Sequence, residues 1–251
     1  MPIKERMTEL KITASTDVGM RHEQNQDCYK AGRLSDDTYW IVLCDGMGGV
    51  SAGGEASFLA VNCLEQALTE TLLDMSSPEE VNKFLGITLK RCNQTIWNIA
   101  NAEGDVITMG TTVVMAVIRN GLAQIVHAGD SRAYVMQKKV LRQITRDHSM
   151  VQELLDSGKI TEEQARSHSH RNIITRALGV EPEIEVAYNE VSLGRDDVLL
   201  LCTDGLSNMV NDDEIQSIIR ESNFYRSADN LVKKAVANGG FDNVTAVLFS
   251  Q

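Results

Sequence analysis

Trp40-Ile41-Val42-Leu43-Cys44-Asp45-Gly46-Met47-Gly48-Gly49 is the stretch that says most about the fold of this chain. It begins as an apolar run typical of a strand and ends in an aspartate and a glycine turn. Residues 198–203 form a second apolar run, which Asp204-Gly205-Leu206 ends in the same way. A strand that ends in a carboxylate brings negative charge to the rim of a sheet, so both stretches indicate a sheet with an acidic rim.

Two further aspartates stand beside turns. Asp27 closes Asn25-Gln26-Asp27, and Asp242 follows Gly239-Gly240-Phe241. If these two share one rim with Asp45 and Asp204, the four carboxylates repel one another and lose hydration unless a cation joins them. Oxygen ligands suit hard cations such as Mg²⁺ and Mn²⁺. The aspartates therefore predict a metal site held by carboxylates, and with it an enzyme.

The composition is that of an acidic globular protein. The chain has 251 residues, of which 43% are hydrophobic, and a formal net charge of −11. This length allows one large domain or two small ones, and no linker rich in Pro, Ser or Gly divides it, so we expect a single domain. The acidity argues against a surface for nucleic acid or for anionic membranes.

The cysteines and the N-terminus indicate the compartment. The five cysteines are odd in number and form no Cys-x-x-Cys pair, which favours buried thiols in a reducing environment. The first residues are charged and lack the apolar stretch of a signal peptide. No run approaches the roughly 20 apolar residues that cross a bilayer. We therefore expect a cytoplasmic protein with no membrane partner.

The order of the expected elements favours an α+β fold over regular βαβ alternation, with helices that cover antiparallel sheets. Apolar residues three or four apart predict one helix face: Phe58, Val61, Leu64, Leu68 and Leu72. The next helix should begin at Ser77, with Pro78 at its first position and Glu80 completing a capping box. The remaining expectations are strands near 10–14, 38–44, 110–144, 184–203 and 244–249, a hairpin turn at Asn120-Gly121, a polar excursion over 147–180, and helices at about 212–221 and 225–238.

Eight short segments follow one another in an order that identifies a family. They are Asp17-Val18-Gly19 with Asn25-Gln26-Asp27, Asp45-Gly46-Met47-Gly48-Gly49, Gly110-Thr111-Thr112, Gly129-Asp130-Ser131-Arg132-Ala133-Tyr134, Gln143-Ile144-Thr145-Arg146-Asp147-His148-Ser149, Arg171-Asn172-Ile173-Ile174-Thr175-Arg176-Ala177-Leu178-Gly179, Asp204-Gly205-Leu206, and Gly239-Gly240-Phe241-Asp242-Asn243-Val244-Thr245. With these segments the chain resembles the metal-dependent Ser/Thr protein phosphatases of type 2C, the PPM family, in their bacterial single-domain form. One glycine turn would be weak evidence, but eight ordered segments exclude chance.

The resemblance implies a four-layer α-β-β-α sandwich. Two antiparallel sheets face each other, helix pairs flank them, the metals lie at one end, and a flap covers the site at about 147–180. The whole of 1–251 is then a single phosphatase catalytic domain, with 1–9 as a short flexible N-terminus.

The resemblance also implies the metal ligands. Asp45 is similar to the carboxylate that bridges two divalent cations, Mn²⁺ or Mg²⁺, and Gly46 to the residue whose carbonyl binds one of them. Asp204 and Asp242 match the ligands of the other cation. Asp27 matches an acid that acts near the first metal largely through water.

A third, weaker metal is implied at Asp130, shared with Asp204. In this scheme Asp45, Asp204 and Asp242 are catalytic through metal-bound water. Two cations about 3.5–4 Å apart lower the pKa of that water, and the hydroxide attacks phosphorus in line. No protein nucleophile is required.

The contact to the substrate phosphate departs from the family pattern. The family commonly places an arginine five residues after the first aspartate of its opening motif, and that position is His22 here, with Arg21 one residue before it. In a strand, an offset of one residue turns a side chain to the other face. Either His22 makes the phosphate contact or a shift of register presents Arg21, and we prefer His22.

The histidines leave the general acid open. Met47 stands where eukaryotic relatives often carry a histidine that protonates the leaving group, and methionine carries no such proton. His148 and His168 lie in the excursion, where either could approach the leaving oxygen, but a solvated loop position is the preferred interpretation for both.

The predicted activity is hydrolysis of phosphoserine and phosphothreonine on proteins by a monomer that opposes a bacterial Ser/Thr kinase. A catalytically weak regulatory or binding module of the same fold is one alternative, and the intact aspartate set disfavours it. A phosphatase dedicated to an anti-anti-sigma-type regulator is the other.

Overall fold

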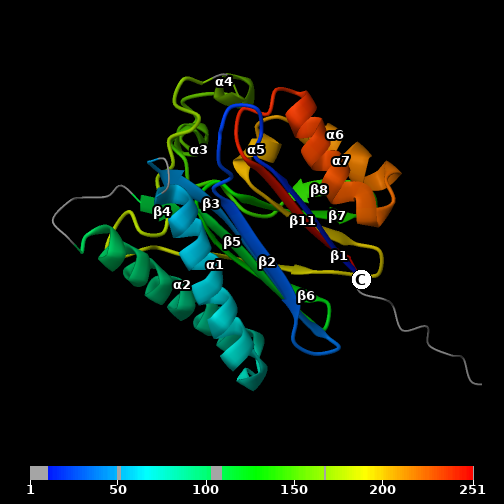
Figure 1. Ribbon diagram of the computed structural model, residues 1–251. Coiled ribbons are helices and arrows are strands. Elements are labelled where there is room, and N and C mark those ends of the chain that lie inside the picture. Colours follow the sequence, from blue (N-terminus) through cyan, green and yellow to red (C-terminus); the bar gives the residue numbers. More distant parts are fainter. Residues whose placement is uncertain (1–10, 50–51, 103–108, 167, 251) are drawn as a thin grey trace, which may run out of the picture.

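The computed structural model describes residues 11–49, 52–102, 109–166 and 168–250. Within them two antiparallel sheets face each other between two layers of helices (Figure 1). The elements are β1 Lys11–Asp17, β2 Asp27–Arg33, β3 Thr38–Gly48, α1 Ala52–Thr71, α2 Pro78–Ala100, β4 Met109–Thr111, β5 Val113–Arg119, β6 Leu122–Ala128, β7 Arg132–Gln137, β8 Val140–Gln143, α3 Met150–Asp156, α4 Glu162–Arg166, β9 Ala187–Ser192, β10 Val198–Cys202, α5 Asp204–Ser207, α6 Asp212–Glu221, α7 Phe224–Ala237 and β11 Val244–Ser250.

One sheet has five strands in the order β1-β11-β10-β7-β8, and the other follows the order β2-β3-β5-β6-β9, with β4 added beside β3. Helices α1 and α2 cover the second sheet, while α6 and α7 cover the first (Figure 1). The predicted four-layer α-β-β-α sandwich is confirmed.

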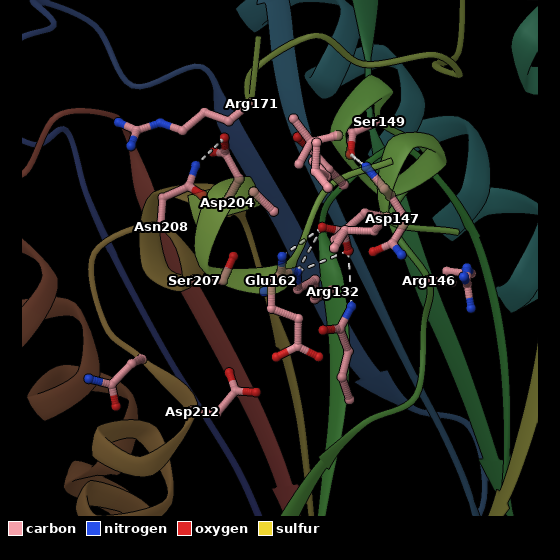
Figure 2. A pocket seen from close by; sticks show the side chains of 18 of the residues that line it. Arg132, Arg146, Asp147, Ser149, Glu162, Arg171, Asp204, Ser207, Asn208 and Asp212 are labelled. Atoms are coloured by element: carbon pink, nitrogen blue, oxygen red, sulfur yellow. Dashed lines mark hydrogen bonds and ion pairs between the residues drawn. The ribbon is translucent and has the colours of Figure 1, made fainter. Parts of the chain in front are cut away.

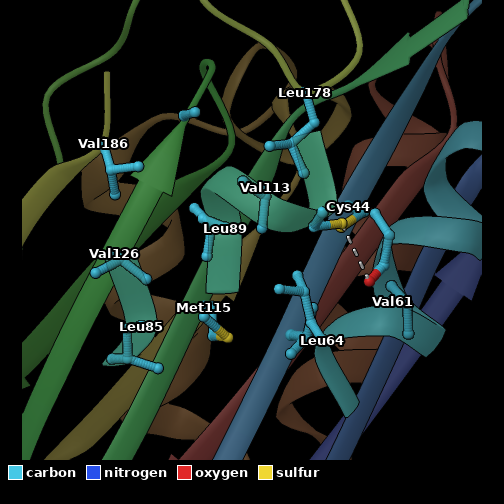
Figure 3. Close-up of a cluster of buried hydrophobic side chains, with 14 of the residues drawn as sticks. Cys44, Val61, Leu64, Leu85, Leu89, Val113, Met115, Val126, Leu178 and Val186 are labelled. Carbon is cyan, nitrogen blue, oxygen red and sulfur yellow. Dashed lines mark hydrogen bonds between the residues drawn. The ribbon is translucent and has the colours of Figure 1, made fainter. Parts of the chain in front are cut away.

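Strand β3 shows why residues 40–44 are apolar throughout. Trp40, Val42 and Cys44 belong to the core under α1 and α2, and Figure 3 shows Cys44 in this core. Ile41 and Leu43 point into the core between the two sheets. A strand that is buried on both faces has no polar alternation, so its sequence reads as one hydrophobic run.

The helix-start and hairpin predictions are confirmed. The Ser77 side chain accepts a hydrogen bond from the Glu80 amide, and the Glu80 side chain bonds back to the cap, with Pro78 at the start of α2. Asn120 and Gly121 have φ angles of 50° and 77°, as the tight turn between β5 and β6 requires.

The prediction that Phe58 belongs to the buried face of α1 is wrong, because its side chain is 59% exposed. The buried stripe runs instead through Ser57, Val61, Leu64 and Leu68. Phe58 follows Ser57 directly and therefore lies about 100° around the helix from that stripe.

The polar excursion contains two short helices, α3 and α4, joined by irregular segments. Its role as a flap stays a prediction. Among the described residues, no helix combines the length and the hydrophobicity needed to pass through a bilayer.

Candidate active site

Two of the predicted metal ligands come from neighbouring strands of one sheet. Strands β2 and β3 pair in antiparallel fashion, and the register places Asp27 directly opposite Asp45. The Asp45 amide donates a hydrogen bond to the Thr112 hydroxyl at 3.1 Å, and the Asp45 carbonyl accepts one from the Thr112 amide at 2.8 Å. The backbone of Asp45 is therefore held on both sides.

Two more aspartates come from the other sheet. Strands β10 and β11 are antiparallel, so the end of β10 lies beside the start of β11. Asp204 begins α5 two residues after β10, and Asp242 stands two residues before β11. The sheet thus brings together two carboxylates that are 38 positions apart in the chain.

Threonine hydroxyls join the two sheets at this end. Thr203 and Thr245 donate hydrogen bonds from Oγ1 to the Asp27 Oδ2 atom, at 3.0 Å and 2.6 Å. Both threonines are buried and belong to the five-stranded side, whereas Asp27 begins β2. The Asp27 carboxylate is therefore fixed between the sheets.

Burial and neighbouring carboxylates raise the pKa of these aspartates. Burial, the Asp204 carboxylate and the Asp242 carboxylate together raise the pKa of Asp27 to about 7. The hydrogen bonds from Thr203 and Thr245 lower this pKa, but by less. Burial and the charge of Asp242 raise the pKa of Asp204 to about 6, although a hydrogen bond with Asp45 lowers it. Burial, Asp27 and Asp204 raise the pKa of Asp45 well above its usual value. Groups that perturb one another this way share one neighbourhood.

Asp130 belongs to the same neighbourhood. It lies between β6 of one sheet and β7 of the other and is only 6% exposed. Burial and the charge of Asp204 raise its pKa to about 8. One carboxylate oxygen of each of Asp27, Asp130 and Asp204 is buried without a hydrogen-bond partner.

The residues fit a hard dication by their chemistry. All the donors are oxygen atoms, their charges repel one another, and buried unpartnered carboxylate oxygens demand a cation or a proton. No group of three or more His, Cys, Asp and Glu side chains in the described part of the chain is arranged to enclose a metal ion as it stands. Such a cage is not required, since Mg²⁺ usually takes one or two carboxylates and keeps several waters.

Gly46 lies where the backbone leaves room for no side chain. A Cβ at this position would come within 2.1 Å of the Gly53 carbonyl oxygen and 2.8 Å of the Gln26 carbonyl oxygen. The Gly46 amide donates a hydrogen bond to that same Gln26 oxygen at 3.1 Å. This close approach explains the glycine after Asp45.

A cleft of about 960 Å³ opens from Asp130 and Asp204. The excursion with α3 and α4 lines one side, and the segment from α5 to α6 lines the other (Figure 2). Inside it Arg132 donates to both carboxylate oxygens of Asp147, at 2.7 Å to Oδ2 and 2.9 Å to Oδ1. This ion pair braces the base of the excursion against β7.

Residues 19–238 match the family model of protein phosphatase 2C. The chain belongs to this family. It is 40% identical over 234 residues to the serine/threonine phosphatase Stp of Listeria monocytogenes, covering 93% of this chain and 92% of that protein. It is 37% identical to the protein phosphatase PhpP of Streptococcus pneumoniae over 247 residues, which is 96% of this chain and 97% of PhpP. Among solved structures, the S. agalactiae serine/threonine phosphatase matches with a TM-score of 0.90 at 32% identity, over 96% of this chain and 99% of that one.

A second solved structure bears on the cofactor. The catalytic domain of the serine/threonine protein phosphatase PstP, in complex with two manganese ions, matches with a TM-score of 0.82 at 33% identity, over 96% of this chain and 97% of that one. Proteins of this family are metal-dependent, which agrees with the oxygen-rich site described above.

His22 and Arg21 lie close to this phosphatase site but point at different neighbours. His22 Nε2 is 3.2 Å from Asp242 Oδ1, whereas the Arg21 guanidinium lies over the Phe241 ring, 5.2 Å from its centroid. Both residues lie in a loop, residues 18–26, and not in a strand. Strand alternation therefore does not apply to His22 and Arg21, since a loop gives neighbouring side chains no fixed opposite faces.

The interpretation of His148 as a solvated loop residue is wrong. Its ring stacks on His127 with centroids 4.7 Å apart, and Nδ1 accepts a hydrogen bond from the Gly129 amide at 3.1 Å. Burial and the neighbouring His127 and Arg176 lower its pKa to about 4, so the ring is neutral near pH 7. Its contacts are those of a packing group beneath the excursion. His168, by contrast, lies against His170, with ring centroids 5.5 Å apart.

The sequence motifs include Asn243 but do not reveal its role at this site. Its side chain is buried and bonds three backbone groups of the 18–26 loop. The only signal in the sequence is its position directly after Asp242.

Proposed function

We propose that this protein hydrolyses phosphoserine and phosphothreonine on other proteins, using two divalent cations held by the aspartate cluster. The observation that carries the proposal is the meeting of carboxylates from both sheets, where burial and the charge of Asp204 raise the pKa of Asp27 and of Asp45. Two bound cations would lower the pKa of a water and neutralise charge on the phosphoryl oxygens. Membership of the protein phosphatase 2C family supports the same reaction.

Each ligand has a proposed role. Asp45 would be a ligand of both cations, the Gly46 carbonyl would complete the first site, and Asp27 would act there through water. Asp204 and Asp242 would hold the second cation. Support comes from the register that pairs Asp27 with Asp45 and from the contact between Asp45 and Asp204.

The choice of metal and a third ion belong to the same proposal. Mn²⁺ or Mg²⁺ suits an all-oxygen site, and the two manganese ions of PstP favour a test with Mn²⁺ first. The third ion would take Asp130 and share Asp204, whose charge raises the pKa of Asp130.

The substrate proposal extends to its biological setting. We infer phosphorylated proteins as substrates, a cognate Ser/Thr kinase as the opposing enzyme, a monomer in the cytoplasm, and the 147–180 segment as a flap over the cleft. The cleft between this segment and α5–α6 begins at Asp130 and Asp204, which supports the passage of a substrate chain there.

The decisive experiment is hydrolysis of a phosphothreonine peptide by the purified protein with Mn²⁺. We expect release of phosphate from phosphothreonine and phosphoserine peptides, little from the matching phosphotyrosine peptide, and none after chelation with EDTA. Restoring excess Mn²⁺ should restore the rate. Undiminished hydrolysis in EDTA would contradict the proposal, and so would failure of the protein to bind Mn²⁺ in calorimetry.

His22 should hold the substrate phosphate. Its side chain lies next to Asp242, while Arg21 turns to Phe241. We expect His22→Ala to raise KM for the phosphopeptide about tenfold, the usual loss for one charge-assisted hydrogen bond. Arg21→Ala is the matched control from the same loop and should change KM less than about twofold. Steady-state kinetics decide the matter, and the reverse ranking would assign the contact to Arg21.

A further inference from the structure

The loop that carries His22 has little support of its own. Residues 20–25 are exposed, and the 18–26 loop contains neither helix nor strand. The ion pair of His22 with Asp242 joins side chains that are 47% and 46% exposed. An ion pair so open to solvent contributes little to holding a loop in place, so another group must order it.

Asn243 is one such group. It is 3% exposed, and its amide nitrogen and its amide oxygen both bond to the loop. Nδ2 donates to the Val18 carbonyl at 2.8 Å and to the Gln24 carbonyl at 3.1 Å, while Oδ1 accepts from the Gln26 amide at 2.8 Å. These bonds reach both ends of the loop from a residue more than 200 positions away in the chain.

The backbone around Asn243 fits the loop closely as well. The Met20 amide donates to the Gly240 carbonyl at 2.7 Å. Gly19 has φ +75°, and a Cβ there would come within 2.3 Å of the Asp242 carbonyl oxygen. The two turns therefore touch, and Asn243 is the buried polar side chain between them.

We propose that Asn243 is a positioning residue that holds the 18–26 loop so that His22 faces Asp242 and the substrate phosphate. The inference rests on the proposed phosphatase function, because it assigns the loop to phosphate binding. Buried amide hydrogen bonds leave unsatisfied partners when one side is removed. Loss of Asn243 should therefore loosen the loop at Val18, Gln24 and Gln26 and leave His22 less firmly placed, although the bonds from Met20 to Gly240 and from Gly46 to Gln26 remain.

Asn93 offers a matched control with the same bonding pattern. It is 1% exposed, its Nδ2 donates to the carbonyls of Glu181 and Pro182 at 2.9 Å and 3.3 Å, and its Oδ1 accepts from the Gly179 amide at 2.8 Å. It ties residues 179–182 to α2, in an outer layer of the sandwich. Asn93→Ala thus removes an equally buried amide with three bonds, but not from the His22 loop.

The first measurement is hydrogen–deuterium exchange on the metal-free protein, which is independent of activity. We expect Asn243→Ala to speed exchange of the Met20 and Gln26 amides, which hydrogen bonds protect in the folded loop, at least about tenfold. Asn93→Ala should leave those amides unchanged and speed exchange over 179–182. If Asn243→Ala fails to fold, Asn243→Ser retains one hydroxyl in the same place and takes over the comparison. Unchanged exchange of the loop in the folded variant would overturn the inference.

The second measurement is kinetic, with the phosphothreonine peptide and Mn²⁺. We expect Asn243→Ala to raise KM about tenfold with kcat lowered less than about threefold, and Asn93→Ala to leave KM within about twofold. Because Asn243 acts through His22, the double variant with His22→Ala should be no worse than His22→Ala alone. If the two substitutions multiplied each other's effect on KM, Asn243 would not act through His22. A fall in kcat with weaker Mn²⁺ binding would also refute the inference, because Asn243 would then act on Asp242. If the wild type hydrolyses nothing, the proposed function fails, while the exchange result still decides whether Asn243 orders the loop.

Discussion

Asp45→Asn is expected to lower kcat/KM by at least about a thousandfold, the scale of losing a charge that acts directly in a metal-assisted hydrolysis. The substitution keeps the shape of the side chain and its place opposite Asp27 in the β2–β3 register. It removes the negative charge that would bridge two cations. Kinetics with the phosphothreonine peptide over a range of Mn²⁺ concentrations measure the loss, and calorimetry measures the weaker binding of Mn²⁺.

Asp37→Asn is the matched control, because Asp37 stands just before the opposite end of β3. It accepts hydrogen bonds from the hydroxyls of Ser35 and Thr38, and an asparagine oxygen can keep them. Its activity should equal that of the wild type. Asp45→Asn should also unfold at a higher temperature than the wild type without metal, because the variant no longer buries a carboxyl group whose pKa burial raises well above its usual value. Full activity in Asp45→Asn would remove the basis of the proposed site.

The metal-free protein should lose stability as the pH rises from 6.5 to 8.5. The folded state holds protons on Asp27 and Asp130, whose pKa values are raised by burial to about 7 and about 8 from an ordinary 3.8. The unfolded chain has released those protons by pH 6.5. This contribution to stability is complete below about pH 4 and is lost as the pH passes the folded values. If the folded state binds on average one proton more than the unfolded state over these two pH units, the free energy of unfolding falls by about 3 kcal/mol. The melting temperature then falls by roughly 6–12 °C.

Thermal unfolding with EDTA and with excess Mn²⁺, at several pH values, checks this expectation. Mn²⁺ should stabilise most at pH 8.5, where it competes with fewer protons. Two other groups are controlled. Burial lowers the pKa of His148 from 6.5 to about 4 in the fold, so its contribution, which rises with pH, ends near the lower edge of the window. The hydrogen bond with Cys92 lowers the pKa of the Cys63 thiol from 9.0 to about 7, and this contribution also rises with pH. Asp45→Asn retains Cys63, so the difference between the two proteins in the pH dependence of melting temperature reports on the carboxylates. An equal pH dependence in both proteins would contradict the interaction of Asp45 with the other carboxylates.

The sequence alone predicted the elements whose cause is local. Ser77, Pro78 and Glu80 start a helix through contacts within one turn, and Asn120-Gly121 closes a hairpin through its own φ angles. The face of α1 was predicted less well, because which residue meets β3 depends on packing that a spacing of three or four only approximates. The four-layer arrangement came from the resemblance to a family and not from periodicity.

The residues of the site show the same difference between local and long-range causes. That Asp45 and Asp204 end apolar strands could be read directly, and their meeting followed from eight ordered motifs. The surroundings of His22, His148 and Asn243 could not be predicted, because each depends on contacts between segments distant in the chain. Loop geometry decides whether His22 or Arg21 faces the aspartates, and no periodicity applies to a loop.

The aspartates are divided between the two halves of the sandwich, and this division has a thermodynamic consequence. Asp27 and Asp45 belong to one sheet, Asp204 and Asp242 border strands of the other, and Asp130 lies on the crossing between them. Ions bound there would join the two sheets, so their affinity depends on the distance between the sheets. By thermodynamic reciprocity, a protein that binds the outer helices and increases this distance would weaken ion binding, and bound ions would weaken the binding of that protein by the same factor. Regulation of such an enzyme from outside its active site therefore requires no second ligand pocket. It requires only a partner whose affinity depends on the distance between the layers.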